Sequence, residues 1–265
     1  MKSVPDPSCQ QSAGVTEPVP PSGIPDSPVL IIPQPGHTPH SGTPRKTPVR
    51  PALKREPALY RDSFYKIRHD NAIHIISENY AYKTESYYTI LSHELEGRKV
   101  RPSSSAVLDA YVVPLCLERA RMAEIPVCEW GISQGYAPLP AILYGLNYFA
   151  TTAEYHVVHD DTQSKEAIRH LTNRGKYPFC YQKLNPEATI STCISVFGKT
   201  AGKCRNVEHL AEQLYDLFSI PLVTMVTVSL GNTHMLSSLS PTRYSRLSAE
   251  ERSILHAYLR HQEFL

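Results

Sequence analysis

The uneven distribution of proline constrains most strongly what this chain can fold into. Fourteen of its 23 prolines lie between Pro5 and Pro57, and the other nine are spread over everything that follows. Proline lacks a backbone N–H and restricts the residue before it to extended geometry, so a segment this rich in proline, Ser, Gly and Thr cannot build a packed core. We therefore expect residues 1–57 to be a disordered proline-rich arm and residues 58–265 to be a folded domain.

The far end of this arm, residues 44–55, is basic, and Ser/Thr-Pro pairs begin at Ser27, Thr38, Thr43 and Thr47. The simplest interpretation of such a segment is a solvated linker. A ligand for a polyproline-binding module and a phosphorylated tether are the alternatives.

Charge and hydropathy exclude several classes of function. The formal net charge is only +2, so no strong overall field attracts nucleic acid or an anionic membrane. The longest apolar stretches, such as residues 220–228, are about half the ~20 residues that a membrane-spanning helix needs. The six cysteines form no CxxC pair, and the first residues have no apolar signal core. The sequence therefore predicts reduced thiols, a cytoplasmic location, and contact with neither membrane nor nucleic acid.

The order of the expected elements indicates an α/β fold. Residues 72–76 are typical of a short buried strand, residues 84–95 have helical spacing that ends before Gly97, and residues 98–101 form a second strand. A helix over 105–122 and a strand over 125–130 follow. Residues 189–197, 207–218 and 222–230 repeat the order of strand, helix and strand, and Ser248 and Glu251 have the spacing of a capping box that starts a final helix. These elements predict a Rossmann-like open, mainly parallel sheet flanked by helices.

Residues 131–187 fit this pattern least well. They are rich in tyrosine and proline and contain one clear helical stretch, over 164–173. We expect this region to be an insertion into the α/β domain.

A strand-to-helix turn at Gly198-Lys199-Thr200 is similar to the end of a phosphate-binding P-loop. The full motif needs a glycine where this chain has Cys193, so the usual cradle of backbone N–H groups is incomplete. An ordinary turn is the main interpretation, and phosphate bound by Gly198, Lys199 and Thr200 is the alternative.

The segment from His156 to Asp161 contains donors that could bind a metal, but on a strand His156 and His159 point to opposite faces. No GxSxG, HExxH or GxGxxG motif is present, and no cysteine has the surroundings of a nucleophile. We expect no metal site and no complete set of catalytic residues.

Tyr80, Tyr82, Tyr87 and Tyr88 surround the first strand-to-helix loop, where open α/β sheets bind ligands. These tyrosines, with Ser103, are the candidate ligand-binding residues. Packing of Tyr87 or Tyr88 against the sheet is the competing explanation for part of this cluster.

Two stretches of the sequence resemble a known domain. Residues 75–88, with their closely spaced tyrosines, and residues 91–103, with Gly97 and Ser103, resemble the opening of the N-terminal domain that precedes the ATP-grasp module in RimK-like ligases. Residues 196–222 and 239–259 look like its second half. Ser86 stands where that pattern has a glycine, and Arg98 where it has a histidine.

The resemblance implies a domain that, in its relatives, packs against a ligase joining a carboxylate to an amine with ATP and magnesium. An ATP-grasp module adds roughly two hundred residues, and about 35 remain after Leu230. We therefore expect a stand-alone accessory domain that binds a substrate or a partner, the partner being a separately encoded ATP-grasp ligase, and that holds no cofactor and is not catalytic alone. The alternative is a nucleotide-using enzyme of the ligase type, with ATP phosphates at Lys199 and Thr200 and magnesium near His159, Asp160 and Asp161.

Overall fold

The computed structural model describes residues 59, 63–69, 71–147, 150–260 and 262–265. All of them belong to Leu53–Leu265, the second of two units into which the chain divides. The arm expected over residues 1–57 lies outside the described residues, so its disorder remains a prediction. No helix in this described part is both long and apolar enough to cross a membrane.

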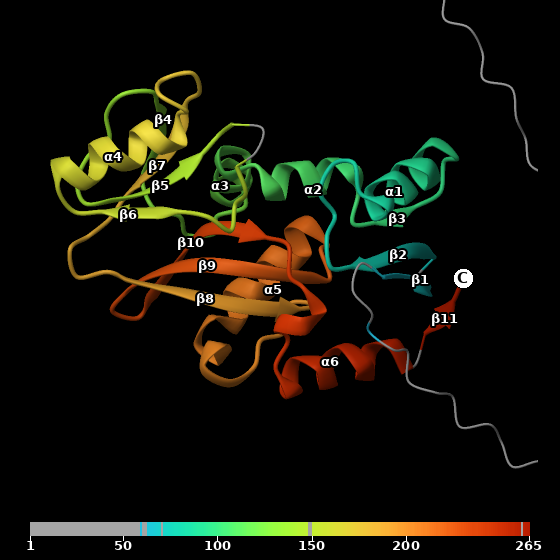
Figure 1. Cartoon of the computed structure of the whole chain (residues 1–265). Helices are drawn as coiled ribbons and strands as arrows, with labels where there is room; N and C mark the ends of the chain where they lie inside the picture. Colours follow the sequence, from blue (N-terminus) through green and yellow to red (C-terminus); the bar gives the residue numbers. More distant parts are fainter. Residues whose placement is uncertain (1–58, 60–62, 70, 148–149, 261) are drawn as a thin grey trace, which may run out of the picture. The chain divides into compact units, whose positions relative to one another are not determined.

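The first sheet has the strand order β11-β1-β2-β3 (Figure 1). β1 (Phe64–His69) and β2 (Ala72–Ser77) are antiparallel, and β11 (Glu263–Phe264) pairs with the outer edge of β1. Helix α1 (Glu85–Leu95) then leads to β3 (Val100–Arg101), which runs parallel to β2. Thr84 caps α1 by accepting a hydrogen bond from the Tyr87 backbone N–H. The first strand–helix–strand unit predicted from the sequence is therefore confirmed.

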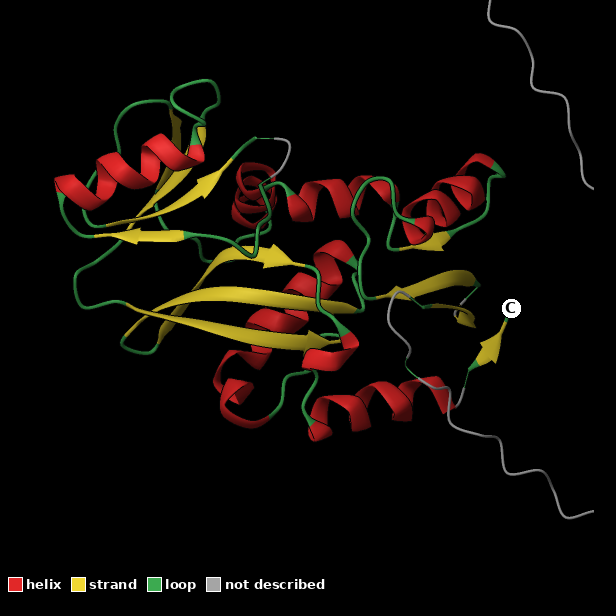
Figure 2. Ribbon diagram, in the orientation of Figure 1, coloured by secondary structure: helices red, strands yellow, loops and turns green. Residues whose placement is uncertain are grey.

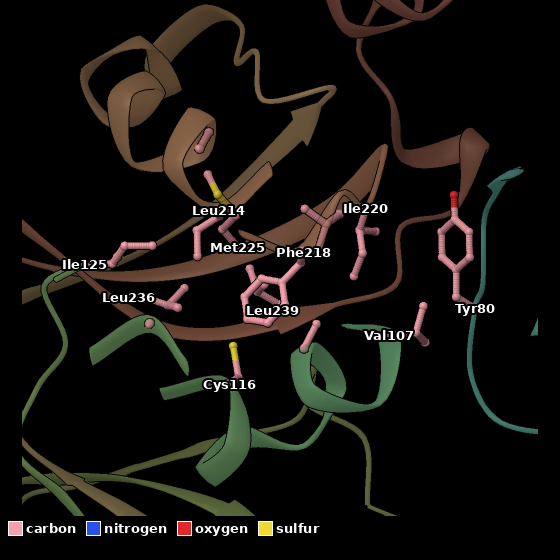
Figure 3. Packing of buried hydrophobic residues seen from close by; sticks show 14 of the residues in the cluster. Tyr80, Val107, Cys116, Ile125, Leu214, Phe218, Ile220, Met225, Leu236 and Leu239 are labelled. Atoms are coloured by element: carbon pink, nitrogen blue, oxygen red, sulfur yellow. The ribbon is translucent and has the colours of Figure 1, made fainter. Parts of the chain in front are cut away.

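The second sheet has the order β10-β9-β8 and is antiparallel throughout. It contains β8 (Thr189–Val196), β9 (Leu222–Leu230) and β10 (Thr233–Ser240), with the 3-10 helix η1 (Gly202–Val207) and helix α5 (Glu208–Phe218) between β8 and β9. Leu214 and Phe218 of α5 point toward Met225 of β9, and Cys116 of α3 (Val113–Met122) joins the same cluster (Figure 3).

The third sheet, of order β4-β7-β5-β6, is also antiparallel. Its strands are β4 (Trp130–Ser133), β5 (Ala141–Gly145), β6 (His156–Val158) and β7 (Phe179–Lys183), and α4 (Asp161–Leu171) lies along it (Figure 2). Tyr144 and Gln182 fasten it to β10, since each makes a buried 2.8 Å hydrogen bond to Ser237. This sheet accounts for most of residues 131–187, and whether they are an insertion remains a prediction.

The predicted Rossmann-like, mainly parallel sheet is wrong. The described part has three small sheets in which β2 and β3 form the parallel pair, together with six α-helices. In particular, β8 and β9 do not form a second parallel strand–helix–strand unit, because they are antiparallel neighbours.

The prediction of a parallel β9 was wrong because this strand is buried on both of its faces. Val223 and Met225 face the cluster that contains α5, whereas Leu222 packs with residues of α6 and Val228 packs with residues of the third sheet. A strand covered on both faces has a continuous apolar run, which is typical of parallel strands but does not require them.

Two further elements differ from their predictions, and the start of the last helix agrees with its prediction. The helix expected over 105–122 is divided at Val112 into α2 (Ser104–Tyr111) and α3, with Pro114 in the first turn of α3. The strand expected over 125–130 is not formed: Val127 makes an isolated bridge, and β4 begins only at Trp130. A short 3-10 helix, η2 (Tyr244–Arg246), precedes α6 (Ala249–Arg260), and the capping box is confirmed because Ser248 and Glu251 exchange both expected hydrogen bonds.

The prediction that all cysteines are reduced is wrong for one pair. Cys193 on β8 and Cys204 in η1 form a disulfide. The other cysteines that the structure describes, Cys116, Cys128 and Cys180, are free and buried. Cys193 and Cys204 are 11 residues apart, so they form no CxxC motif in the sequence. The two sulfur atoms meet because the chain turns back after β8.

Candidate functional site

The turn that follows β8 is tight and built from left-handed backbone. Phe197 and Gly198 have φ angles of 52° and 77°, and the backbone groups of Val196 and Lys199 bond to each other in both directions. The hydroxyl of Thr200 donates a 2.9 Å hydrogen bond to the Cys204 carbonyl. The Lys199 N–H and the Thr200 hydroxyl are thus already engaged by the protein, unlike the open donors of a P-loop. Phosphate binding by Gly198, Lys199 and Thr200 remains a prediction.

The Lys199 ammonium group lies between two carboxylates of α5. It forms an ion pair with Glu212, and Glu208 lies 3.6 Å away. The hydrogen bond that the Lys199 ammonium group donates to Glu212 is the main cause that raises the pKa of Lys199, so the side chain is firmly cationic. Its position is therefore set from α5, and its charge is partly balanced there.

Beside Lys199 is a pocket of about 430 Å³, which we call the cationic pocket. It is built by residues from β1, β2, β3, the turn after β8, α5 and α6. The pocket is lined by His69, His74, Arg101, Phe197, Lys199, Tyr215, Ile254 and Tyr258. Its size lies within the range of ligand pockets in proteins.

The lining of the cationic pocket combines positive charge with aromatic rings. Arg101 forms no ion pair within the described residues, so its guanidinium group is available to a ligand. The ring of Phe197 stacks on Tyr258 at 3.7 Å between centroids and meets Tyr215 edge-on. Burial raises the pKa of Tyr215 to about 12, with Arg101 acting in the opposite direction. No carboxylate is among the described residues that line this pocket.

The predicted tyrosine site is divided between core and surface. Tyr80 is fully buried, and its hydroxyl donates to the Ile75 carbonyl and accepts from the Ser77 N–H. Tyr87 is also in the core, and its ring contacts the rings of Tyr82 and Tyr88, both of which are more than half exposed.

Tyr82 lines a different hollow, an apolar groove of about 520 Å³ beside α2 and α3. Ser103 is the cap of α2, where its hydroxyl oxygen accepts a hydrogen bond from the Ala106 N–H. The structure does not bring Ser103 or the tyrosines into the cationic pocket. Ligand binding by Tyr80, Tyr82, Tyr87, Tyr88 and Ser103 remains a prediction.

Replacing Tyr80 with phenylalanine is expected to lower the free energy of unfolding by about 1–3 kcal/mol, because the Ser77 N–H and Ile75 carbonyl lose a buried partner. Tyr111→Phe is the matched control, since the buried Tyr111 hydroxyl has no hydrogen-bond partner in the described part and its loss is expected to be close to neutral. Urea unfolding of both variants measures the difference. Equal losses would contradict the assignment of Tyr80 to the core.

His159 and Asp160, two candidate metal-binding residues, have structural roles at the start of α4. Asp160 caps α4 by accepting hydrogen bonds from the N–H groups of Thr162 and Gln163, and the His159 N–H donates to the Gln163 side chain. Among the described residues, no group of three or more His, Cys, Asp or Glu side chains is placed to hold a metal ion.

Several solved structures of ATP-grasp proteins are similar to part of this chain. A RimK domain ATP-grasp protein from Sphaerobacter thermophilus matches 65% of this chain and 77% of its own length, at 13% identity and a TM-score of 0.48. D-alanine–D-alanine ligase from Helicobacter pylori matches 65% of both chains, at 13% identity and a TM-score of 0.48. The same ligase from Coxiella burnetii matches 66% of this chain and 60% of its own, at 9% identity and a TM-score of 0.46.

This chain thus spans less than two thirds of either D-alanine–D-alanine ligase. No family model matches the sequence, and no curated protein matches it significantly. Identities and TM-scores this low do not assign the activity of any of these proteins to this chain.

Most of the cationic pocket was not predicted from the sequence. Lys199 is a candidate site residue in the sequence, whereas Arg101 and His74 are assigned only to strands, Tyr258 only to the final helix, and His69 to no element. Arg101 follows two other basic residues, Arg98 and Lys99, and nothing in the sequence distinguishes the one that enters a pocket. The register between β2 and β3, which sets Arg101 opposite His74, supplies the missing information.

Proposed function

We propose that the described part of this chain is a binding domain, not catalytic alone, that accepts an anionic ligand carrying an aromatic or apolar group. The observation that carries this proposal is that Arg101 and Lys199, from separate elements, line one pocket with three aromatic side chains and no carboxylate among its described lining residues.

The two cations make unequal contributions. Lys199 is exposed and already paired with two carboxylates, so an incoming anion must compete for it. Arg101 has no such competitor in the described part, and a guanidinium group binds carboxylate or phosphate through two parallel hydrogen bonds. Arg101 is therefore the main anchor of the charge, and the rings of Phe197, Tyr215 and Tyr258 pack against the rest of the ligand.

An accessory role beside a separately encoded ATP-grasp ligase, and a cytoplasmic location, belong to the same proposal. They are supported by the resemblance of residues 75–103 to the N-terminal domain of RimK-like ligases. The apolar groove at Tyr82, with Leu108, Leu115 and Ile132 exposed around it, offers surface for a protein partner.

The minimal ligand for this pocket is phenyl phosphate, which joins one aromatic ring to one anion. At 100 times its Kd it is expected to add about 2.7 kcal/mol to the stability of the full chain. Arg101→Gln is expected to weaken binding about 10- to 100-fold, because a hydrogen bond to a charged group is lost. Thermal unfolding with increasing ligand measures both effects.

Arg98→Gln is the matched control, because Arg98 is exposed, lies three residues away and pairs with Glu96 outside the pocket. Inorganic phosphate and phenol, tested separately, show whether charge and ring are both required. Equal binding by Arg101→Gln and Arg98→Gln would overturn the proposal. Binding and hydrolysis of ATP with magnesium, lost in Lys199→Ala, would favour the alternative of a nucleotide-using enzyme.

A further inference from the structure

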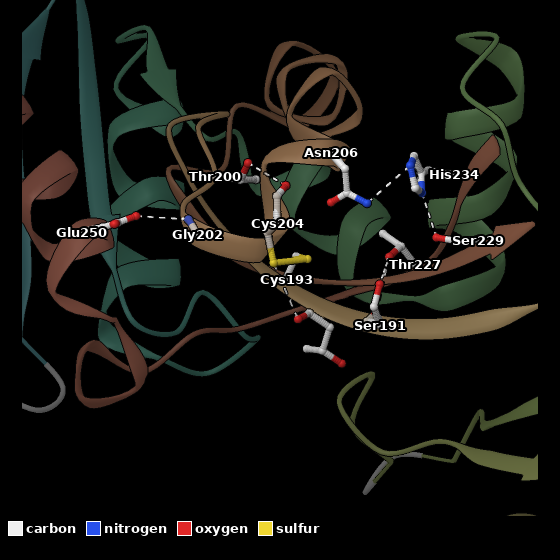
Figure 4. The surroundings of a disulfide bond; sticks show 11 residues. Ser191, Cys193, Thr200, Gly202, Cys204, Asn206, Thr227, Ser229, His234 and Glu250 are labelled. Carbon is white, nitrogen blue, oxygen red and sulfur yellow. Dashed lines mark hydrogen bonds between the residues drawn. A yellow bond between two sulfur atoms is a disulfide. The ribbon is translucent and has the colours of Figure 1, made fainter. Parts of the chain in front are cut away.

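The disulfide encloses the segment that supplies one wall of the cationic pocket. Figure 4 shows the bond between Cys193 of β8 and Cys204 of η1. Phe197, Gly198 and Lys199 lie between these cysteines in the sequence. Two of these three residues, Phe197 and Lys199, line the pocket. The covalent link therefore closes a short loop whose tip faces the ligand site.

Two backbone hydrogen bonds between Val196 and Lys199 close the turn itself, but the ties that hold the return segment to Cys204 are fewer. The Thr200 hydroxyl bonds to the Cys204 carbonyl, and the exposed Gly202 N–H donates to a Glu250 carboxylate oxygen at 3.1 Å (Figure 4). Lys199 is held by exposed carboxylates of α5. The Gly202 bond and the Lys199 ion pairs are exposed and contribute little stability each, because water competes for the same groups.

We infer that the redox state of the Cys193–Cys204 pair regulates the cationic pocket: the oxidised chain holds the Phe197–Lys199 wall in the binding geometry, and reduction releases it. This inference rests on the proposed function for its effect on binding. A cytoplasmic location would suit it, since disulfides in reducing compartments are usually transient or redox-sensing.

Reduction by a dithiol begins at the more accessible sulfur. Cys204 is half-buried and flanked by the exposed, basic Lys203 and Arg205, whereas Cys193 is buried. A thiolate of the dithiol attacks Cys204 Sγ, and the bond to Cys193 breaks, so that Cys193 leaves as a thiolate and takes up a proton. The second thiol of the reductant then attacks the mixed disulfide and frees Cys204. Two electrons and two protons pass to the protein, and the dithiol becomes a disulfide.

The remaining described cysteines are poor competitors in this chemistry. Burial raises the pKa of Cys128 to about 11 and of Cys180 to about 12, and it raises the pKa of Cys116 further. Because the thiolate is the reactive form, these thiols react slowly at neutral pH. Cys9 lies outside the described residues, so the test uses a Cys9→Ser chain.

The test compares oxidised and dithiothreitol-reduced Cys9→Ser chain by hydrogen–deuterium exchange of residues 194–204 and by titration with phenyl phosphate. We expect reduction to speed exchange in this segment, leave exchange in the third sheet unchanged, and weaken binding about 3- to 10-fold, since the loop must then be ordered by the ligand. A Cys193→Ser/Cys204→Ser chain is expected to match the reduced form and to be insensitive to dithiothreitol.

The outcomes separate the two proposals. Equal exchange of residues 194–204 in both redox states would overturn the redox inference, whatever the binding result. Equal affinity in both states, with binding intact, would overturn it as well. A redox-dependent exchange rate without binding in either state would refute the proposed function and leave the redox control of the loop standing.

Discussion

Replacing Gly198 with valine is expected to lower the free energy of unfolding by about 2–5 kcal/mol and to abolish binding of phenyl phosphate. At φ +77° a β-branched side chain is strained. A Cβ there would lie 3.1 Å from the Tyr215 Cβ and 3.2 Å from the Glu212 Cα, so α5 would have to move away from the turn. Overpacking of this kind typically costs 1–3 kcal/mol, in addition to roughly 1–2 kcal/mol for the backbone.

Gly97→Val separates these two causes. Gly97 has φ +71°, close to that of Gly198, but nothing lies within 4 Å of the position its Cβ would take. This control is expected to lose only the backbone contribution, about 1–2 kcal/mol, and to keep phenyl phosphate binding. Urea unfolding and ligand titration of both variants give the comparison. If Gly198→Val bound the ligand as Gly97→Val does, the turn after β8 would not form part of the site.

The sequence located this turn but could not reveal what faces it. A strand that ends before Gly198 and a helix that begins soon afterwards follow from local periodicity and from the permissive backbone of glycine. The other walls of the cationic pocket come from His69, Arg101 and Tyr258, which are far from the turn in the sequence. Only sheet pairing and helix packing bring them together, and neither is encoded in a local pattern.

The same limit explains which parts of the fold were predicted correctly. The strands at 72–76, 189–197 and 222–230 and the helices at 84–95 and 207–218 lie close to their observed bounds, because apolar spacing and caps are local properties. Strand direction is not local. The chain between β8 and β9 contains a helix, as a parallel crossover would, yet β9 returns antiparallel to β8. Periodicity alone cannot distinguish these two paths.

Tyrosine shows the limit of residue type as a guide to function. Tyr80 and Tyr82 are two residues apart in a predicted ligand site, but one is fully buried and the other is more than half exposed. Tyr144 and Tyr244 are buried as well. Much of the tyrosine content of the described part therefore belongs to the core, which has a measurable consequence at high pH.

Alkaline pH is expected to unfold this chain cooperatively above about pH 11. Burial raises the pKa values of Tyr80, Tyr111, Tyr144 and Tyr244 above their usual value of 10, because the phenolate ion is poorly solvated in the core. A group whose folded pKa is raised contributes stability that is complete below its unfolded pKa and is lost as the pH rises toward the folded value. Four such groups together remove about 5 kcal/mol per pH unit once the pH exceeds 10, against a typical domain stability of 5–15 kcal/mol.

Absorbance at 295 nm and far-ultraviolet circular dichroism, followed over the same pH range, measure this transition. Because the four buried phenols ionise only when the core opens, part of the phenolate signal is expected to rise together with the loss of helix signal. Tyr111→Phe removes one of the four groups and is expected to shift the midpoint of unfolding upward in pH. Complete ionisation of all tyrosines in a chain that still shows native circular dichroism would contradict the burial of these hydroxyls, and with it the assignment of Tyr80 to the core rather than to a ligand site.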